Sequence, residues 1–170
     1  MTTKPEKLST LARQRQLRES KNLFARLPAV YAASRKQGQY LLRQSAGISI
    51  VEWRTLWDLT EAGPLTIREL AKIQRTDHSL VSRALPAMRN KGLIEMRQNP
   101  EDGREMLVAI TAQGSAAFEL AAPTMQSRRQ ELSRRFTSIE LDQFVEFLDR
   151  LDDFLRSPAD ILVKKNELNK

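Results

Sequence analysis

The chain of 170 residues carries 28 Lys and Arg against 21 Asp and Glu, a formal net charge of +7. It contains no Cys and one His, which excludes a disulfide framework, a thiolate metal site, a cysteine nucleophile and a cluster of His ligands. No apolar run approaches the roughly 18 residues of a membrane span, and no secretory signal follows the N-terminus. We therefore expect a soluble, cytoplasmic, single-domain protein without cofactor, metal or membrane contact, and with a polyanionic partner.

The charge is unevenly distributed. Residues 1–22 have a net charge of +4 and few apolar side chains, which predicts a basic flexible arm or a frayed helix. Residues 128–135 have a net charge of +3, whereas residues 136–160 have a net charge of −5. This polarity favours one side for a polyanion and a separate acidic side.

Two helices are expected in the first part of the chain. Apolar residues at helical spacing predict one over residues 23–44, with Pro28 and Gly38 as kinks or ends. Ser49 begins the second, and the Gly-Pro pair at residues 63–64 ends it.

Two short helices and a hairpin follow. Thr66 and Glu69 form a capping box at the start of the first short helix, because their side chains satisfy free amide groups there. Asp77 is a suitable N-cap for the second, which Gly92 ends. Alternating apolar residues then predict a β-hairpin over residues 94–110 with a charged tip.

Two longer helices complete the chain. Thr111 caps the first, which is expected over residues 112–136 with a kink at Pro123, and Thr137 begins a second capping box. The last helix carries an apolar stripe. The predicted fold is mainly α with a small β-hairpin wing, a winged helix-turn-helix flanked by terminal helices.

The helix that follows Asp77 has two chemically different faces when it is drawn at 100° per residue. One face is apolar and consists of Val81, Ala84, Leu85 and Met88. The opposite face consists of Ser79, Ser82, Arg83, Pro86 and Asn90. Hydroxyl, guanidinium and amide groups read base edges or bind phosphates, and free backbone N–H groups near His78 and Ser79 also favour phosphate. The alternative is an ordinary solvated face, which the order of capped helix, turn, helix and hairpin disfavours.

Several motifs occur in a fixed order. They are G-I-S-x-x-E-W-x-x-L from Gly47, V-S-R from Val81, K-G-L-I from Lys91, D-G-R from Asp102 and I-T-A-Q-G from Ile110. Together they make the chain resemble the MarR family of bacterial transcription regulators over residues 23–155. The resemblance implies a sequence-specific homodimeric DNA-binding regulator, with repression favoured over activation.

The resemblance also implies which side chains meet DNA. Ser79, Ser82 and Arg83 match positions that enter the major groove. Arg104, held by Asp102, matches a wing-tip arginine in the minor groove, where narrow A·T-rich stretches concentrate negative potential. Lys91 and several other cations are phosphate candidates, although a solvated surface charge is an equally good interpretation of each. The predicted DNA-binding set is Thr66, Arg75, His78, Ser79, Ser82, Arg83, Arg89, Arg97, Asp102 and Arg104.

Two departures from the family pattern concern the helix-turn-helix. Gln74-Arg75 stands where the family usually has a Leu-Gly pair, which puts the turn geometry in doubt unless Arg75 compensates by reaching a phosphate. Pro86 removes the hydrogen bond to the Ser82 carbonyl and is expected to kink the helix after its reading residues.

The terminal helices carry more apolar surface than a winged helix can cover. Packing within one chain is one solution, but the resemblance favours two chains interlocked as a homodimer. The interface candidates are Leu23, Leu27, Leu141, Phe144, Leu148, Leu151, Phe154 and Leu155. Two-fold symmetry then predicts double-stranded DNA with a pseudo-palindromic operator as the partner.

The resemblance implies a possible small-molecule effector, commonly aromatic or anionic, between the dimer helices and the winged helix. The candidates to line its pocket are Tyr31, Arg35, Tyr40, Trp53 and Trp57, with core packing the favoured role for both Trp residues.

Two other function classes are disfavoured. A nonspecific architectural DNA-binding protein does not need the acidic last helix or the polar reading face. An enzyme that uses Asp77, His78 and a serine as a triad is disfavoured because adjacent helical residues point in different directions and no Gly-rich elbow accompanies them. We expect the protein to be associated with the nucleoid. Its expected organisation is a basic arm (1–22), dimerisation regions (23–46 and 111–156), a winged helix-turn-helix (47–110) and a C-terminal tail (157–170).

Overall fold

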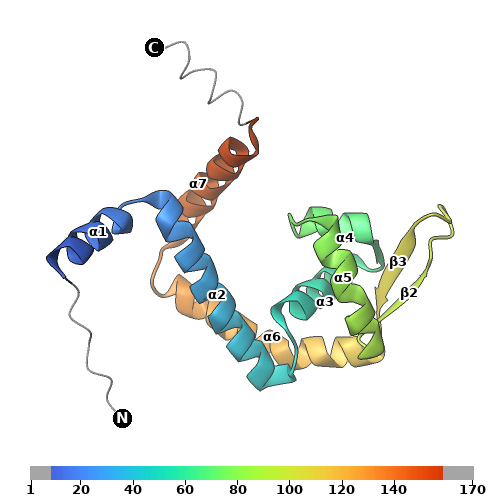
Figure 1. Ribbon diagram of the computed structural model, residues 1–170. Coiled ribbons are helices and arrows are strands. Elements are labelled where there is room, and N and C mark those ends of the chain that lie inside the picture. Colours follow the sequence, from blue (N-terminus) through green and yellow to red (C-terminus); the bar gives the residue numbers. More distant parts are fainter. Residues whose placement is uncertain (1–8, 159–170) are drawn as a thin grey trace. The chain divides into compact units, whose positions relative to one another are not determined.

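The computed structural model describes residues 9–158, so the C-terminal tail beyond residue 158 lies outside the described residues. These divide into two compact units, which meet between Met125 and Gln126 and are described separately (Figure 1). No helix among the described residues is long and apolar enough to cross a membrane.

The first unit begins with two helices. α1 (Thr10–Ser20) has no buried residue, and the Ser9 hydroxyl caps it by accepting a 3.3 Å hydrogen bond from the N–H of Ala12. Residues 10–20 of the expected arm are therefore helical, while residues 1–8 lie outside the described residues. α2 (Leu23–Ala46) continues through both Pro28 and Gly38, so neither ends the helix.

The middle of the first unit consists of short helices and a small sheet. In chain order these are α3 (Ile50–Ala62), β1 (Leu65–Thr66), α4 (Ile67–Ile73), α5 (His78–Asn90), β2 (Ile94–Gln98) and β3 (Met106–Ile110). The Ser49–Glu52 and Thr66–Glu69 pairs each form a complete capping box, at the starts of α3 and α4. The predicted winged helix-turn-helix is therefore confirmed.

The sheet has one strand more than the hairpin that we expected. Its order is β1-β3-β2 and both pairings are antiparallel, with Leu65 opposite Val108 and Ile94 opposite Ile110. β1 is only two residues long, and its strand conformation depends on pairing with β3. It ties the start of α4 to the wing.

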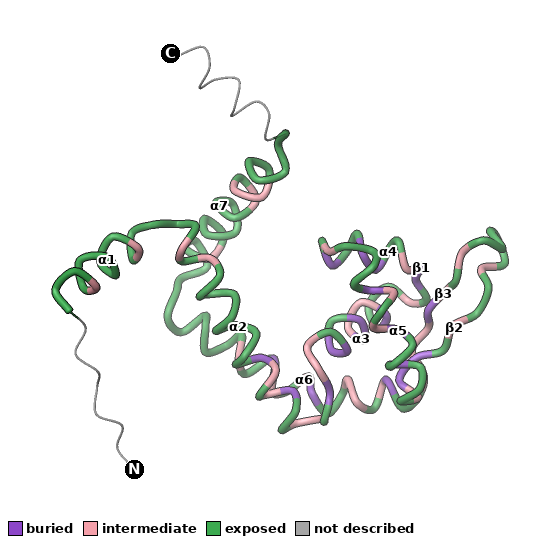
Figure 2. Tube along the Cα trace, in the orientation of Figure 1, coloured by how far each residue is buried: buried purple, intermediate pink, exposed green. Residues whose placement is uncertain are grey.

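One hydrophobic core lies beneath the helices and the sheet. Figure 2 shows buried positions on α3, α4, α5 and β3, whereas α1 has none. The largest side chains that are essentially inaccessible to solvent are Leu42, Leu56, Leu59, Leu70, Leu85, Met88, Ile94 and Val108. Burial of this size stabilises by about 1.5–3 kcal/mol per side chain, and it fixes α5 against the rest of the unit.

Two helices follow the wing. α6 (Ala112–Ser133) runs from the first unit into the second, continues through Pro123, and ends three residues before the expected Phe136. It ends there because the chain turns into the Thr137–Glu140 capping box, which begins α7 (Ser138–Arg156). No residue of α7 is buried, so its apolar stripe is uncovered within its own unit.

Candidate nucleic-acid interface

The start of α5 is fixed by Asp77. Its carboxylate accepts a 2.6 Å hydrogen bond from the backbone N–H of Ser79. Hydrogen bonds from the Ser79 side chain and backbone lower the pKa of Asp77, so the cap stays charged. The Ser79 hydroxyl is thus partly engaged in the cap, and the backbone N–H groups of Ser79, Leu80 and Val81 all donate to Asp77.

The two faces of α5 differ as the sequence predicts. Val81, Leu85 and Met88 are at most 3% exposed and belong to the core, whereas Ser79 and Arg83 are exposed. α5 is helical through Pro86 to Asn90, so the proline does not end it. The buried face holds the helix in place while the other face remains accessible.

The outward side chains are partly restrained by the backbone of the same helix. The Arg83 Nε donates a 3.0 Å hydrogen bond to the Ser79 carbonyl, and the Ser82 hydroxyl donates to the same oxygen at 3.3 Å. Ser82 is half-buried. These contacts bring Ser79, Ser82 and Arg83 together in the first two turns, as expected, while the exposed His78 occupies the first helical position.

The turn between α4 and α5 contains no glycine, but one of its residues has the left-handed backbone conformation that glycine favours. Arg75 has φ = 48°, and it is the one non-glycine residue with positive φ among those described. The preceding Gln74 is buried, and its amide donates to Asp58 Oδ2 at 2.8 Å and to Thr55 Oγ1 at 3.4 Å. Polar partners on α3 therefore accommodate Gln74, and Arg75 adopts a conformation that glycine would adopt with less strain.

Thr66 differs from the expectation for it. It is buried, and its hydroxyl donates to Glu69 Oε2 at 2.9 Å while accepting the Glu69 N–H at 3.2 Å. Both interactions belong to the α4 cap, and hydrogen bonds from Thr66 lower the pKa of Glu69. In this structure the hydroxyl is committed to the cap and is not presented to a phosphate.

The tip of the wing is organised by its own side chains. Asp102 Oδ1 accepts a 3.0 Å hydrogen bond from the backbone N–H of Arg104, so Asp102 holds the backbone of Arg104. Gln98 Nε2 also donates to the Gly103 carbonyl at 2.6 Å. Arg97 and Arg104 are both exposed. The wing thus presents an arginine from an ordered turn.

Two ion pairs that the sequence analysis missed connect these elements. The Lys91 Nζ lies 2.7 Å from Glu52 Oε1, and Glu52 is only 5% exposed. Lys91 is therefore bound to the start of α3, which weakens its candidacy as a phosphate ligand. Arg68 on α4 lies 3.7 Å from Glu105 beside the wing. Their long sequence separations left no local signal for either pair.

The candidate effector residues fall into different environments. Trp53 is 3% exposed, stacks on Phe118 at 4.9 Å, and meets Trp57 edge-on at 5.6 Å. The two Trp residues therefore pack in or against the core, as favoured. Tyr31 and Arg35 form a separate cation–π pair at 5.9 Å on α2, where Tyr31 is exposed, as is Tyr40.

The expected dimer residues are available on the surface of each unit. Leu23, Phe144, Leu148, Phe154 and Leu155 are all more than 40% exposed. The three remaining candidates, Leu27, Leu141 and Leu151, are half-buried.

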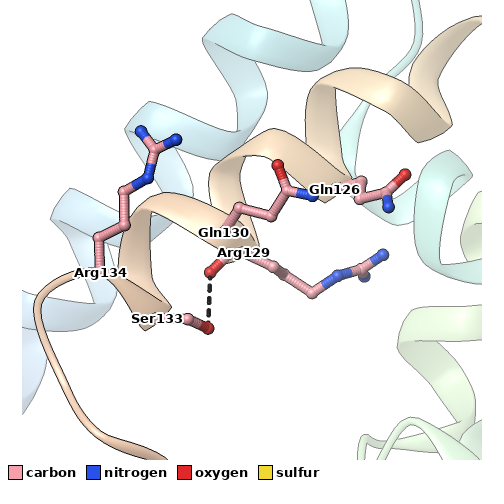
Figure 3. A pocket seen from close by; sticks show the side chains of 5 residues that line it. All are labelled: Gln126, Arg129, Gln130, Ser133 and Arg134. Atoms are coloured by element: carbon pink, nitrogen blue, oxygen red, sulfur yellow. Dashed lines mark hydrogen bonds between the residues drawn. The ribbon is translucent and has the colours of Figure 1, made fainter.

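The basic stretch near the end of α6 lines an open polar hollow. Figure 3 shows its side chains, and the Ser133 hydroxyl donates to the Arg129 carbonyl at 3.2 Å. The exposed residues that line it are Gln126, Arg129, Gln130, Ser133 and Arg134. The hollow belongs to the second unit, whereas α5 belongs to the first.

Comparison with known proteins identifies the fold and the family. The MarR family matches residues 48–106. The multiple antibiotic resistance protein MarR of Salmonella typhimurium is 30% identical over 115 residues, which cover 66% of this chain and 80% of that protein. The transcriptional repressor IacR of Pseudomonas putida is 29% identical over 126 residues, which cover 71% of this chain and 73% of IacR. The crystal structure of a mutant MarR from E. coli, complexed with operator DNA, matches with a TM-score of 0.61 and 25% identity. The match covers 77% of this chain and 99% of that chain. The chain belongs to the MarR family, whose members are transcriptional regulators and not enzymes.

Proposed function

We propose that this protein is a homodimeric repressor that binds a pseudo-palindromic operator in double-stranded DNA through α5 and the wing. The observation that carries the proposal is that Ser79 and Arg83 are exposed on a helix whose other face is buried in the core. A reading helix must be both accessible and rigidly held, because a misplaced donor loses its base contact. The MarR structure with operator DNA supports the same role here.

The chemistry of α5 suits the major groove. The guanidinium of Arg83 is a bidentate donor that fits guanine O6 and N7, and serine hydroxyls accept or donate to either kind of base edge. The hydrogen bond from Arg83 Nε to the Ser79 carbonyl restrains the side chain on the outward face. His78 is exposed at the first helical position, where its ring N–H can donate to a phosphate. These groups together position the helix and discriminate bases.

The wing and the surface cations supply the remaining contacts. We infer that Arg104 enters the minor groove, where its backbone is held in position by Asp102. Arg75, Arg89 and Arg97 are exposed cations on the same winged helix-turn-helix and bind phosphates in this proposal. We leave Thr66 out of the contact set, because its hydroxyl is used in the α4 cap.

A homodimer is supported by the uncovered apolar stripe of α7. Phe144, Leu148 and Leu155 are between 41% and 57% exposed in the single chain, and a stripe of this width requires a partner. A second copy covers it and also brings two α5 helices to one face of the DNA. We expect light scattering to give twice the chain mass of 19.5 kDa.

The dimer has a matched pair of test variants. Leu148→Lys places a charge in the α7 stripe and is expected to give monomers, whereas Glu146→Gln changes the net charge by the same amount on the opposite side of the helix and leaves the dimer intact. If Leu148→Lys were as dimeric as the wild type, α7 would not be the interface.

We further propose that a small aromatic or anionic molecule releases the DNA. Such a ligand releases DNA only if it binds more tightly to a dimer conformation that does not fit the operator than to the conformation that does. The exposed Tyr31–Arg35 pair offers an aromatic ring and a guanidinium to an aromatic acid. A screen of aromatic carboxylates for loss of DNA binding, repeated with Arg35→Ala, tests this. Release that is unaffected by the substitution would rule out the pair as the site.

The operator itself is found by selecting genomic fragments that the purified protein retains. The proposal predicts enrichment of a small number of promoter fragments that share a pseudo-palindrome, consistent with action at the nucleoid. Retention of fragments without any common motif would instead support a nonspecific architectural protein.

A further inference from the structure

Leu80 is an apolar side chain on the accessible side of the proposed reading helix. It is 55% exposed, whereas the next residue, Val81, is 3% exposed. At 100° per residue, Leu80 lies only about 60° from Arg83 around the α5 axis. Leu80 therefore shares the outward surface with Arg83 and does not belong to the core-facing side.

The residues that follow Leu80 along this edge of α5 are small. Ala84, one turn later, is half-buried, and Ala87, two turns later, is exposed. Neither is long enough to shield a leucine side chain. The reading surface thus has a polar centre at Ser79 and Arg83 and an apolar edge from which Leu80 protrudes.

We propose that Leu80 contacts the 5-methyl group of a thymine in the major groove and sets the base preference at one position of each half-site. This inference rests on the proposed DNA-reading role of α5. Leucine has no hydrogen-bonding group, so it cannot distinguish donor and acceptor patterns. The thymine methyl is the apolar feature of the major-groove edge, and cytosine, the other pyrimidine, lacks it.

The expected size of the effect follows from burial of one methyl group. Removing such a group from a water-excluded contact lowers affinity about fourfold. Because the operator has two half-sites, removing both methyl groups is expected to lower affinity by more than about tenfold. This is well within the resolution of a competition binding measurement.

The test uses bases that differ by the methyl group alone. An operator is first obtained by selection from random duplexes with the wild-type protein, and each thymine is then replaced symmetrically by deoxyuridine. One position is expected at which the wild type loses more than about tenfold in affinity. Leu80→Ala is expected to bind the thymine and deoxyuridine operators equally at that position. Placing 5-methylcytosine there, in place of cytosine, is expected to recover part of the wild-type affinity.

Two further variants keep the test decisive. Leu120→Ala removes a similarly exposed leucine, 64% accessible, from α6. It is expected to keep the wild-type ratio of affinity for the thymine operator to affinity for the deoxyuridine operator. Leu80→Thr retains one methyl group and is expected to give an intermediate ratio. If Leu80→Ala and Leu80→Thr kept the full wild-type ratio, the inference would be wrong while the proposed function stood. If the wild type selected no sequence at all, the proposed function itself would fail.

Discussion

The side-chain amide of Gln74, at the end of α4, donates a 2.8 Å hydrogen bond to the carboxylate of Asp58 on α3. The backbone carbonyl of Gln74 in turn accepts a 2.8 Å hydrogen bond from Arg54 Nη2. Burial raises the pKa of Asp58, and the hydrogen bond from Gln74 opposes that rise. Two residues of α3 therefore fix the residue that precedes the helix-turn-helix turn.

Replacing Gln74 by leucine is expected to lower the free energy of unfolding by about 1–2 kcal/mol, because it leaves the carboxylate of Asp58 without its amide partner. Urea denaturation measures the change. Lys72→Leu, an exposed position on the same helix, is the control and should change stability by less than about 0.5 kcal/mol. Equal stability of Gln74→Leu and wild type would mean that the Asp58 contact contributes nothing.

Arg75→Gly is expected to stabilise the fold and weaken DNA binding. Glycine adopts φ near 48° without the cost of about 1–2 kcal/mol that other residues incur, although part of the gain is lost to the more flexible unfolded chain. Loss of the guanidinium should make the slope of log affinity against log salt concentration shallower, by about the contribution of one phosphate contact per subunit. Arg75→Ala separates the two effects, since it removes the charge but keeps the strain. If both variants had the same stability, strain at this residue would be negligible.

Gly114→Ala is expected to be strongly destabilising. A Cβ atom there would lie 2.0 Å from the Leu93 carbonyl oxygen and 2.9 Å from Ile110 Cγ1, both at the junction of the wing with α6. Overpacking against backbone costs about 1–3 kcal/mol or more. Gly103→Ala, at the wing tip, meets only the Gln98 amide at 3.4 Å and should unfold at nearly the wild-type temperature. A thermally stable Gly114→Ala protein would show that α6 can move away from the wing.

Acid is expected to weaken the contact between Glu52 and Lys91. Burial alone raises the pKa of Glu52, but hydrogen bonds from Lys91 and Ser49 outweigh it, so the net pKa is below its ordinary value of 4.5. A lowered pKa in the folded state contributes stability that is present above about pH 4.5 and is lost as the pH falls through the folded value.

Urea denaturation at several pH values tests this dependence. Glu52→Gln should be less stable than wild type by about 1–3 kcal/mol at neutral pH, and the difference should shrink on acidification. Lys91→Met removes the same ion pair, so the difference in its free energy of unfolding from that of the wild type should also become smaller at low pH. A difference that is constant from about pH 7 to about pH 3 would contradict the assignment.

Local sequence signals predicted the helix starts and the reading face. The caps at Thr66, Asp77 and Thr137 are all present, because a cap depends on residues within one turn. The apolar spacing of Val81 and Leu85 likewise sufficed to orient α5.

Features that depend on distant partners were missed. β1 is a strand only because Leu65 pairs with Val108, and Lys91 meets Glu52 from 39 positions away in the chain. The buried hydroxyl of Thr66 shows the same limit: the sequence predicted its cap but not that burial removes it from the surface. Pro28, Pro86 and Pro123 all lie inside helices, so none of them ends its helix.

The central claim is that the exposed face of α5 reads DNA sequence, and competition binding of wild type and Arg83→Ala to the selected operator and to random DNA tests it most directly. The wild type should prefer the operator at least about a thousandfold. Arg83→Ala should lose about 1–3 kcal/mol on the operator and much less on random DNA, which narrows the preference. Arg89→Ala, a phosphate candidate on the same helix, should lower both affinities alike. An Arg83→Ala protein that lost equal affinity for the two DNAs would contradict the claim.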